Sequence, residues 1–355
     1  MASIVTEASA VICLRALAKR TMVNVYGTLM LYGNEKGLFA HAHTNKWEGW
    51  VRLSCETMST LAVQMCDVRA LAKAIGGKHP PSSLVVGGDN IAIGGAVLGT
   101  RPIPTQDIVA APEVSGDTIH VRCDAMLQAL DSTSYAMSVD DGRLALCGVF
   151  VDTRDCALNV VATDGRRMVA RYLGPYFGQA AGRFIPSDIV WILRETLSVE
   201  PCGEGVALSG DVVVTPRMTF NTHTNHHNYP DYRQVLPNGT HTRSLAVDRT
   251  LMLDAAREAQ RNRLSDGALV IAPRDDSAIT LTCEHWSKTM SGLCVNLPDA
   301  VAVNPRYLID TLKAQDAGVI TLRFDSEHPV TSPIDIVGEP GLRTVIMPIR
   351  VGPVA

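Results

Sequence analysis

Apolar residues recur at helical spacing in three stretches of the chain, and two strand-like runs follow each stretch. Residues three and four positions apart lie on one face of a helix, so this spacing predicts amphipathic helices. The expected helices span residues 8–21, 123–135 and 248–263. The expected strand pairs span 28–32 with 37–43, 148–152 with 157–162, and 267–272 with 278–284.

A second helix is expected in each third of the chain, followed by another strand pair. Asp67, Ser187 and Asn304 are suitable N-caps because their side-chain oxygens can accept hydrogen bonds from free backbone N–H groups, and Pro305 suits a first helical position. These helices are expected at 67–75, 187–197 and 304–314. The strand pairs that follow them are expected within 84–95, 205–216 and 318–338.

The same order of elements therefore occurs three times, with corresponding caps about 120 residues apart, a spacing that suits one domain per repeat. The pattern predicts an α+β fold of three similar domains, each with two helices and several antiparallel strands. We expect the domains to span residues 1–117, 118–243 and 244–355.

Composition agrees with an ordered globular protein, since 46% of the residues are hydrophobic and 19% are charged. No apolar run reaches the roughly 18 residues needed to cross a bilayer, and the first twenty residues do not read as a signal peptide. The nine cysteines are scattered and form no CxxC pair. We therefore expect free thiols in a reducing cytosol.

The formal net charge of −4 argues against a protein that binds nucleic acid through bulk positive charge. It allows one that concentrates lysine and arginine on a single surface. The positions of the basic residues in the fold then become the decisive question.

Three short motifs occur in order along the chain: ATDGRRMVA at 162–170, YPDYRQVLP at 229–237 and VIMPIRV at 345–351. They resemble the ATDG-x-R-[LM]-A stretch, the [FY]-P-D-Y-x-x-[VL]-[LIV]-P segment and the closing [VI]-[MLI]-P-[MVI]-[RK]-[LV] of the bacterial DNA polymerase III β subunit, the sliding clamp family. The resemblance is clearest over about residues 118–351.

The resemblance implies a three-domain clamp chain that pairs head to tail as a homodimeric ring. Such a ring encircles duplex DNA without sequence preference and acts as the processivity factor of the replicative DNA polymerase. The implied partners are the polymerase and the clamp loader. The resemblance implies a cytoplasmic, non-catalytic subunit that needs no cofactor or metal and does not contact a membrane.

The family's inner wall is built from the helices of each repeat, so basic residues on the expected helices are candidates for contact with DNA. Arg249, Arg257 and Arg261 recur at spacings of eight and four and share a helix face. The alternative for each residue is an ordinary solvated cation on a surface helix. The candidates are Arg20 and Arg69, which best match family positions, with Lys73, Arg15, Lys19, Arg249, Arg257 and Arg261.

The family also binds short peptides of its partners through apolar anchors. Leucine, methionine, valine and isoleucine suit such a groove, although core packing is the alternative for Val235 and Val345. Arg166 and Gln234 depart from the family pattern. The matching groove positions are Leu146, Thr163, Gly165, Arg167, Met168, Pro230, Val235, Val345, Met347, Pro348 and Ile349.

Other interpretations of the sequence lead to different functions. A divergent clamp-like adaptor or decoy would keep the peptide groove without supporting replication. An α+β enzyme would use Asp164 or the histidines as catalytic groups, but no base or nucleophile partner follows from the spacing. His223, His226 and His227 lack a carboxylate or cysteine partner at ligand spacing, so a surface segment is favoured over a metal site.

Overall fold

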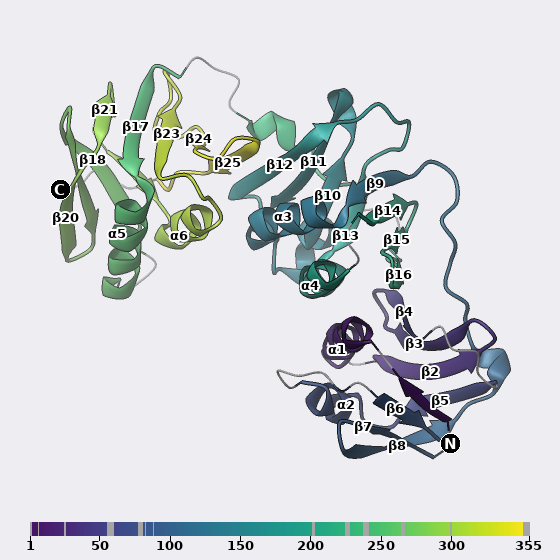
Figure 1. Ribbon diagram of the computed structural model, residues 1–355. Coiled ribbons are helices and arrows are strands. Elements are labelled where there is room, and N and C mark those ends of the chain that lie inside the picture. Colours follow the sequence, from purple (N-terminus) through teal and green to yellow (C-terminus); the bar gives the residue numbers. More distant parts are fainter. Residues whose placement is uncertain are drawn as a thin grey trace. The chain divides into compact units, whose positions relative to one another are not determined.

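The structure is a computed structural model of residues 1–355 (Figure 1). It describes every residue except 1, 6, 25, 55–59, 77–80, 82, 88, 201–202, 224–227, 237–240, 264–266, 299 and 351–355. Contacts divide the chain into two compact units. Unit 1 comprises residues 1–130 and 176–227, and unit 2 comprises residues 131–175 and 228–355.

Unit 1 contains a sheet in the order β1-β6-β7-β8-β5-β2-β3-β4-β16-β15-β14-β9. Its helices are α1 (Ala8–Thr21), α2 (Val68–Ala74) and α4 (Ser187–Thr196), and α3 (Cys123–Thr133) begins in it. Its strands are β1 (Ala2–Val5), β2 (Thr28–Asn34), β3 (Gly37–His43), β4 (Glu48–Ser54), β5 (Leu61–Met65), β6 (Ser83–Val86), β7 (Asn90–Ile93), β8 (Ala96–Pro102), β9 (Ile119–Arg122), β13 (Arg183–Pro186), β14 (Gly205–Ser209), β15 (Val212–Val214) and β16 (Met218–Asn221).

The apolar faces of α1 and α4 are buried in unit 1, where the two helices pack against each other. Beneath α1, a Cβ at Gly49 would lie 2.9 Å from Leu17 Cδ1 and 3.0 Å from Phe220 Cδ1. A glycine is therefore needed where α1 closely approaches the sheet. Trp47 packs edge-on against Phe220 with ring centroids 6.4 Å apart.

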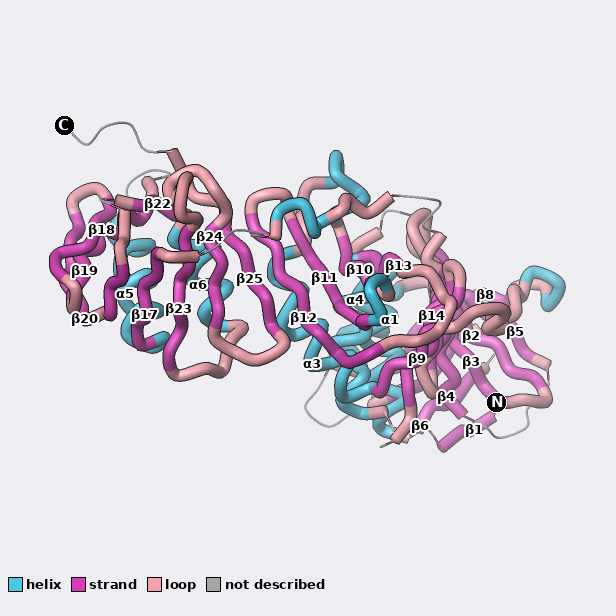
Figure 2. Tube along the Cα trace, turned by 90° about the horizontal axis from the view of Figure 1, so that it is seen from above, coloured by secondary structure: helices cyan, strands magenta, loops and turns pink. Residues whose placement is uncertain are grey.

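Unit 2 contains strands in the order β10-β11-β12-β25-β24-β23-β17-β21 and a sheet in the order β20-β19-β18-β22. Figure 2 shows the strands from β10 to β17 as a row. Its helices are α5 (Arg249–Asn262) and α6 (Pro305–Lys313). Its strands are β10 (Gly148–Asp152), β11 (Ala157–Thr163), β12 (Arg167–Pro175), β17 (Arg243–Asp248), β18 (Leu269–Asp275), β19 (Ala278–Cys283), β20 (Trp286–Ser291), β21 (Leu293–Val295), β22 (Val301–Val303), β23 (Val319–Phe324), β24 (Ile334–Val337) and β25 (Leu342–Ile346).

The main core of unit 2 lies between the two helices and the sheets. Met252 and Ala259 of α5, Leu312 of α6, and Leu322 and Phe324 of β23 belong to one buried cluster. The alternation along β23 places Arg323 on the sheet face opposite this cluster, where it is exposed. The polar faces of α5 and α6 are thereby left to solvent.

The expected order of elements is confirmed: all six helices form close to their expected ranges, and the strand pairs that follow them also form. Asp67 caps α2 by accepting from Ala70 N at 2.9 Å, and Asn304 caps α6 by accepting from Arg306 N at 3.0 Å. Ser187 is not an N-cap, so that prediction is wrong. The chain is extended to Pro186, whose backbone enters α4 directly, which makes Ser187 the first helical residue.

Two strand pairs cross the expected domain boundaries. Strand β4 pairs with β16, with Val51 opposite Met218, and β12 pairs with β25, with Met168 opposite Val345. These pairs make the sheets continuous from one expected domain to the next. The division into residues 1–117, 118–243 and 244–355 stays a prediction.

The cysteines agree with the expected free thiols wherever the structure describes them. Cys13, Cys66, Cys123, Cys147, Cys156, Cys283 and Cys294 are free, whereas Cys55 and Cys202 lie outside the described residues. No group of metal-ligating side chains gathers among the described residues, and His226 and His227 lie outside them. Within the same residues, every helix is too short or too polar to span a membrane.

Candidate nucleic-acid interface and peptide-binding surface

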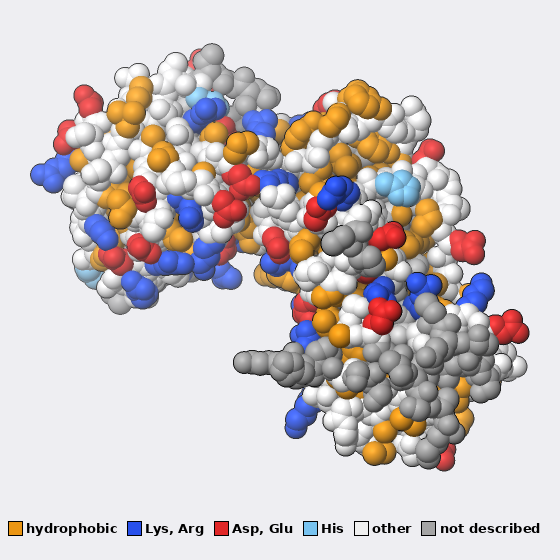
Figure 3. Space-filling model, in the orientation of Figure 1, with side chains coloured by type: hydrophobic (Ala, Val, Ile, Leu, Met, Phe, Trp, Pro, Cys, Tyr) orange, Lys and Arg blue, Asp and Glu red, His pale blue; other side chains and the backbone are white. Residues whose placement is uncertain are grey.

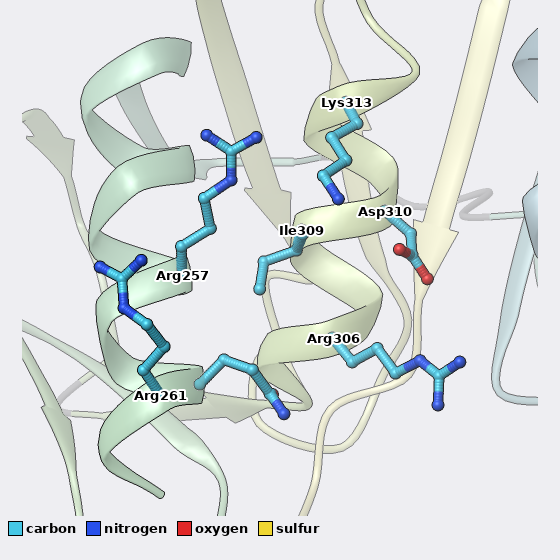
Figure 4. Close-up of a pocket in the computed structure, with 7 residues that line it drawn as sticks. Arg257, Arg261, Arg306, Ile309, Asp310 and Lys313 are labelled. Atoms are coloured by element: carbon cyan, nitrogen blue, oxygen red, sulfur yellow. The ribbon is translucent and has the colours of Figure 1, made fainter.

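A pocket of about 440 Å³ opens between α5 and α6 in unit 2. Figure 4 shows Arg257 and Arg261 on α5, and Ile309 pointing from α6 toward α5. Arg306 and Asp310 lie along the other edge of α6. The pocket is lined by Arg257, Gln260, Arg261, Arg306, Ile309, Asp310 and Lys313.

The packing of the two helices explains why basic side chains gather here. Met252, Ala255 and Ala259 of α5 and Leu308 and Leu312 of α6 are buried in the core. The charged positions between them must therefore face solvent. In Figure 3, lysine and arginine side chains gather over this region of α5 and α6.

Several acidic groups near the pocket already have cationic partners. Asp254 pairs with Arg257 at 3.1 Å, and Glu258 pairs with Lys288 at 2.9 Å. Asp310 pairs with Arg167, which does not line the pocket, at 2.8 Å. Within the described chain, Arg261, Arg306 and Lys313 form no ion pair, so the pocket has an excess of positive charge.

Arg249 has a different environment from the other expected DNA contacts on α5. Its Nε donates to the carbonyl of Ala317 at 2.8 Å, and its Nη1 donates to the carbonyl of Leu312 at 3.1 Å. These bonds satisfy carbonyls at and beyond the C-terminal end of α6. The contact of Arg249 with DNA stays a prediction, beside this evident structural role.

The expected DNA contacts of unit 1 lie on α1 and α2. Lys19 is paired with Glu195 at 3.1 Å, and the Arg20 guanidinium lies 5.7 Å from the ring centre of Trp191. Arg15 is half-buried, and its Nε has no hydrogen-bond partner within the described residues. Arg69 and Lys73 are exposed, four residues apart on α2, and share one helix face.

The positions expected to bind peptides all lie in unit 2, around a small apolar cluster. Met168 and Val345 face each other across β12 and β25, and each is only 1% exposed. They pack with Val161, Ala170 and Tyr232. Core packing therefore accounts for Val345, which forms the floor of this region together with Met168.

Other expected positions are accessible to solvent. Val235 is 40% exposed and Pro230 is exposed, so core packing does not account for Val235. Leu146, Met347, Pro348 and Ile349 are half-buried. We call these six residues together the peptide surface. Its apolar side chains are available for contact with a ligand.

The turn at 163–167 borders the peptide surface and is held by a threonine hydroxyl. Thr163 Oγ1 accepts from Gly165 N at 3.0 Å and donates to the carbonyl of Arg167 at 2.7 Å. Gly165 has φ +83°, which an L side chain disfavours. The backbone of Met347 is fixed to the turn by its N–H bond to the carbonyl of Arg166, 2.8 Å long.

Arg167 is only 9% exposed, and internal partners occupy its guanidinium. Its Nε donates to Asp164 at 3.0 Å, its Nη1 to Asp310 at 2.8 Å and its Nη2 to the carbonyl of Tyr135 at 2.6 Å. The guanidinium also lies 4.6 Å from the ring centre of Tyr307. Arg167 thus connects the turn beside the peptide surface to α6, a link that the motif did not predict.

A hydrogen-bonded carboxylate supports the other side of the peptide surface. The hydroxyl of Tyr232 donates to Asp152 Oδ2 at 2.8 Å, and Arg154 Nε donates to Asp152 Oδ1 at 2.8 Å. Burial acts to raise the pKa of Asp152, but these hydrogen bonds outweigh it and lower that pKa. Asp152 therefore holds the YPDY segment as a carboxylate.

Comparison with curated proteins finds relatives over most of the chain, although no protein-family model matches it. The beta sliding clamp of Caulobacter vibrioides is 22% identical over 324 residues, which cover 85% of this chain and 83% of the relative. The beta sliding clamp of Synechococcus elongatus is 24% identical over 287 residues, or 73% of each chain. The resemblance inferred from the three motifs is thus confirmed.

Solved structures confirm the fold. The DNA polymerase III beta subunit of Thermotoga maritima matches with a TM-score of 0.80 and 17% identity, over 99% of both chains. That of Pseudomonas aeruginosa matches with a TM-score of 0.80 and 18% identity, over 98% of this chain and 99% of the other. The α+β clamp fold therefore extends over nearly the whole chain.

Proposed function

We propose, on the premise that this chain is related to β sliding clamps in sequence and has their fold, that it is a sliding clamp for DNA replication. It would encircle duplex DNA and act as the processivity factor of the replicative DNA polymerase. The observation that carries this proposal is the extent of the likeness, 85% of the chain in sequence and 99% in fold. The proposal includes a division into three repeated domains, at residues 1–117, 118–243 and 244–355.

The distribution of charge supports an interaction with the DNA backbone despite the net charge of −4. The helices carry exposed cations at Arg69, Lys73 and Arg261, and the α5–α6 pocket has more cations than carboxylates. Contacts to phosphate carry no sequence information. A ring that uses them can slide along any sequence while it remains linked to the duplex.

The peptide surface supports binding of the polymerase and the clamp loader through short peptides. Val235 is exposed and Met347 and Ile349 are half-buried, so all three offer apolar area to a ligand. Methionine adapts to varied apolar ligands, which suits a surface shared by several partners. Arg166 is exposed beside it and would favour peptides with acidic residues near that end.

The repeat supports a head-to-tail homodimer. In each repeat, three strands follow the first helix. The third of these strands pairs with the last strand of the next repeat, as in the β4–β16 and β12–β25 pairs. The corresponding strand of the last repeat, β20, pairs only with β19 within the described chain. In β8, the last strand of the first repeat, Val97 is 70% exposed. Pairing β20 of one copy with β8 of a second would repeat the same junction and close a ring.

The proposed subunit is cytoplasmic and performs no bond chemistry, so Asp164 has a structural role in this proposal. Its carboxylate accepts hydrogen bonds from the backbone N–H groups of Arg166 and Arg167 and from Arg167 Nε. The relatives named as clamps do not favour an adaptor or decoy.

Loader-dependent retention on nicked circular DNA tests the proposal. The wild-type protein is expected to stay on the circle at a salt concentration that removes it from linear DNA, and sedimentation should give a dimer. Met347→Ala should lose loader and polymerase binding while it remains dimeric. Met22→Ala is the matched control, because Met22 is 42% exposed and lies in unit 1. A monomeric wild-type protein that is not retained would refute the proposal.

A further inference from the structure

A second pocket, of about 200 Å³, lies in unit 1 between the start of α3 and the chain that follows α4. We propose that this pocket binds the alkylammonium group of a small amine. The inference goes beyond the proposed clamp function, because neither duplex DNA nor the peptide of a replication partner is its ligand. It assigns a role to carboxylates that the DNA and peptide sites do not use.

The charged side chains that line this pocket leave an excess of carboxylates. Arg122, the single cation of the described lining, donates from Nε to Asp124 Oδ1 at 3.0 Å and from Nη2 to Asp124 Oδ2 at 2.6 Å. Glu200 and Glu204 line the same pocket, and Glu204 is exposed without an ion pair inside the described chain. Arg122 and Asp124 therefore neutralise each other, and two carboxylates remain for an external cation.

Glu200 gives independent evidence for a ligand, because its buried carboxylate is only partly satisfied. Its side chain is fully buried, and its Oε1 accepts from Thr215 Oγ1 at 2.7 Å. Its Oε2 has no hydrogen-bond partner among the described residues. Arg217 Nε lies 4.0 Å from this oxygen, beyond hydrogen-bonding distance, and Arg217 Nη2 pairs with Glu7. Buried polar atoms usually have a partner, so the N–H group of an ammonium ligand would supply the missing donor.

The buried groups of the pocket also favour an organic cation over a metal ion. Burial raises the pKa of Glu200, and a cation beside it would act in the opposite direction. Burial, and then the charge of Glu200, raise the pKa of Cys123, which also lines the pocket, to about 11. The Cys123 thiol is therefore neutral at pH 7 and provides no thiolate for a transition metal. No group of three side chains suited to a metal ion occurs in the described part of the chain.

The apolar part of the lining suits a short alkyl chain. Leu127 of α3 and Leu197 line the pocket, and Leu197 is only 3% exposed. A hydrated inorganic ion gains nothing from such walls, whereas methylene groups are stabilised when they are buried against them. The pocket is smaller than the roughly 300–1,000 Å³ of sites for drug-sized ligands, so a small amine fits better than a nucleotide. The uncompensated carboxylates also repel phosphate groups.

A titration of the full-length protein with butylamine tests the site directly. Leucine methyl signals are recorded by NMR at neutral pH and constant ionic strength, with butanol and sodium chloride as matched controls. Butylamine should shift the signals of Leu127 and Leu197 in a saturable manner, because its ammonium reaches the carboxylates while its chain contacts the two leucines. Butanol has the same chain without the charge and should bind at least about tenfold more weakly. Equal binding of butanol, or no shift with butylamine, would overturn the proposal.

Charge-neutral variants show which carboxylate holds the amine. Glu200→Gln keeps an acceptor for Thr215 and removes the buried charge, so butylamine should bind about tenfold more weakly. Glu204→Gln should weaken binding by about two- to threefold, since Glu204 is exposed. Glu35→Gln is the control, because Glu35 is an exposed acid of unit 1 outside the pocket. Wild-type affinity in Glu200→Gln would refute the assignment. If thermal unfolding shows that Glu200→Gln does not fold, Glu204→Gln decides, and an affinity equal to that of Glu35→Gln refutes it.

A free amine and the side chain of a lysine carry the same ammonium group, and a lysine derivative distinguishes these two sources. Nα-acetyl-lysine amide has the butylammonium end attached to a peptide-like group. The pocket of about 200 Å³ should favour butylamine. Stronger binding of the lysine derivative would mean that the ligand is a protein side chain, and the proposal of a small amine would fail. None of these measurements involves DNA or a partner peptide, so their failure is distinct from a failure of the proposed function.

Discussion

The β4–β16 junction of unit 1 and the β12–β25 junction of unit 2 are built from corresponding strands, yet they are stabilised differently. In unit 1, Gly49 lets α1 approach the sheet, and Trp47 packs against Phe220. In unit 2, the buried Arg167 connects the junction to α6 through Asp310. The comparison teaches that corresponding strands pair at both junctions, while the side chains at each junction decide its chemistry.

The connections that lead into these junctions show the same contrast. Thr44 Oγ1 accepts from Trp47 N and donates to the carbonyl of Trp47, as Thr163 Oγ1 does with Gly165 N and the carbonyl of Arg167. Both turns are thus closed by one threonine hydroxyl. Only the unit 2 turn also has a glycine with positive φ.

The largest expected effect is the loss of the unit 2 network. Arg167→Ala should lower the free energy of unfolding of unit 2 by about 3–5 kcal/mol, because it leaves Asp164 and Asp310 without their buried partner. Hydrogen exchange of the β12 and β25 amides during urea titration measures this locally. Arg323→Ala should change stability by less than about 0.5 kcal/mol. Equal losses of unfolding free energy in Arg167→Ala and Arg323→Ala would show that the buried network does not stabilise unit 2.

Low pH should lower the free energy of unfolding of unit 1 through His41. His41 is buried against Trp50, with ring centroids 4.5 Å apart, and burial lowers the pKa of His41 to about 4. The unfolded chain, with a histidine pKa near 6.5, binds the extra proton first. The contribution of neutral His41 to the free energy of unfolding is therefore fully present above about pH 6.5. It falls as the pH drops toward 4, by roughly 3 kcal/mol.

His41→Phe keeps the ring stacking and removes this titration, so urea midpoints measured from pH 7 to pH 4 should become flatter in unit 1. Hydrogen exchange in β3 and β4 assigns the change to that unit. Glu48 Oε1 lies 3.7 Å from His41 Nε2, so the wild type and the variant are compared at each pH. An identical pH dependence in both proteins would show that His41 is not responsible.

The turn at 163–167 should give an intermediate effect. Gly165→Ala is expected to lower the free energy of unfolding by about 1–2 kcal/mol, because alanine is disfavoured at φ +83°. Lys46→Ala, in the corresponding turn of unit 1, should have little effect because that turn has no positive φ among its described residues. Thermal unfolding of the two variants tests the difference. A neutral Gly165→Ala would mean that the turn relaxes.

The smallest effect should come from the ion pair on the helices of unit 1. Lys19→Ala should lower the free energy of unfolding by no more than about 1 kcal/mol, since both Lys19 and Glu195 are partly exposed. The loss should shrink further as salt is added. Urea titrations at low and high salt measure it. A large, salt-independent loss would indicate that Lys19 has another role.

Much of the fold follows from local sequence. The helix at 8–21 agrees with α1 at both ends, and Asp67, Asn304 and Pro305 perform the predicted roles at helix starts. These features depend on periodicity and on backbone bonds within a few residues. Ser187 shows the limit of such reasoning, because a suitable cap residue was present and the preceding extended strand moved the helix start by one position.

The candidate site was predicted less completely. The motifs identified the turn at 163–167 and the surface around Met347, but nothing in them indicated that Arg167 would be buried against Asp310, which lies 143 residues away. The helical spacing placed Arg257 and Arg261 on one face of α5. Their convergence with Arg306 and Lys313 depends on how α5 packs against α6.

The sequence by itself determined the repeat, the order of helices and strands and the three motifs, because each of these is recorded in residues close together along the chain. The tertiary structure decided which strands of different repeats pair, which cations lack partners and where Arg167 lies. Pairing between distant segments depends on sheet register and helix packing, and these have no local signature in the sequence.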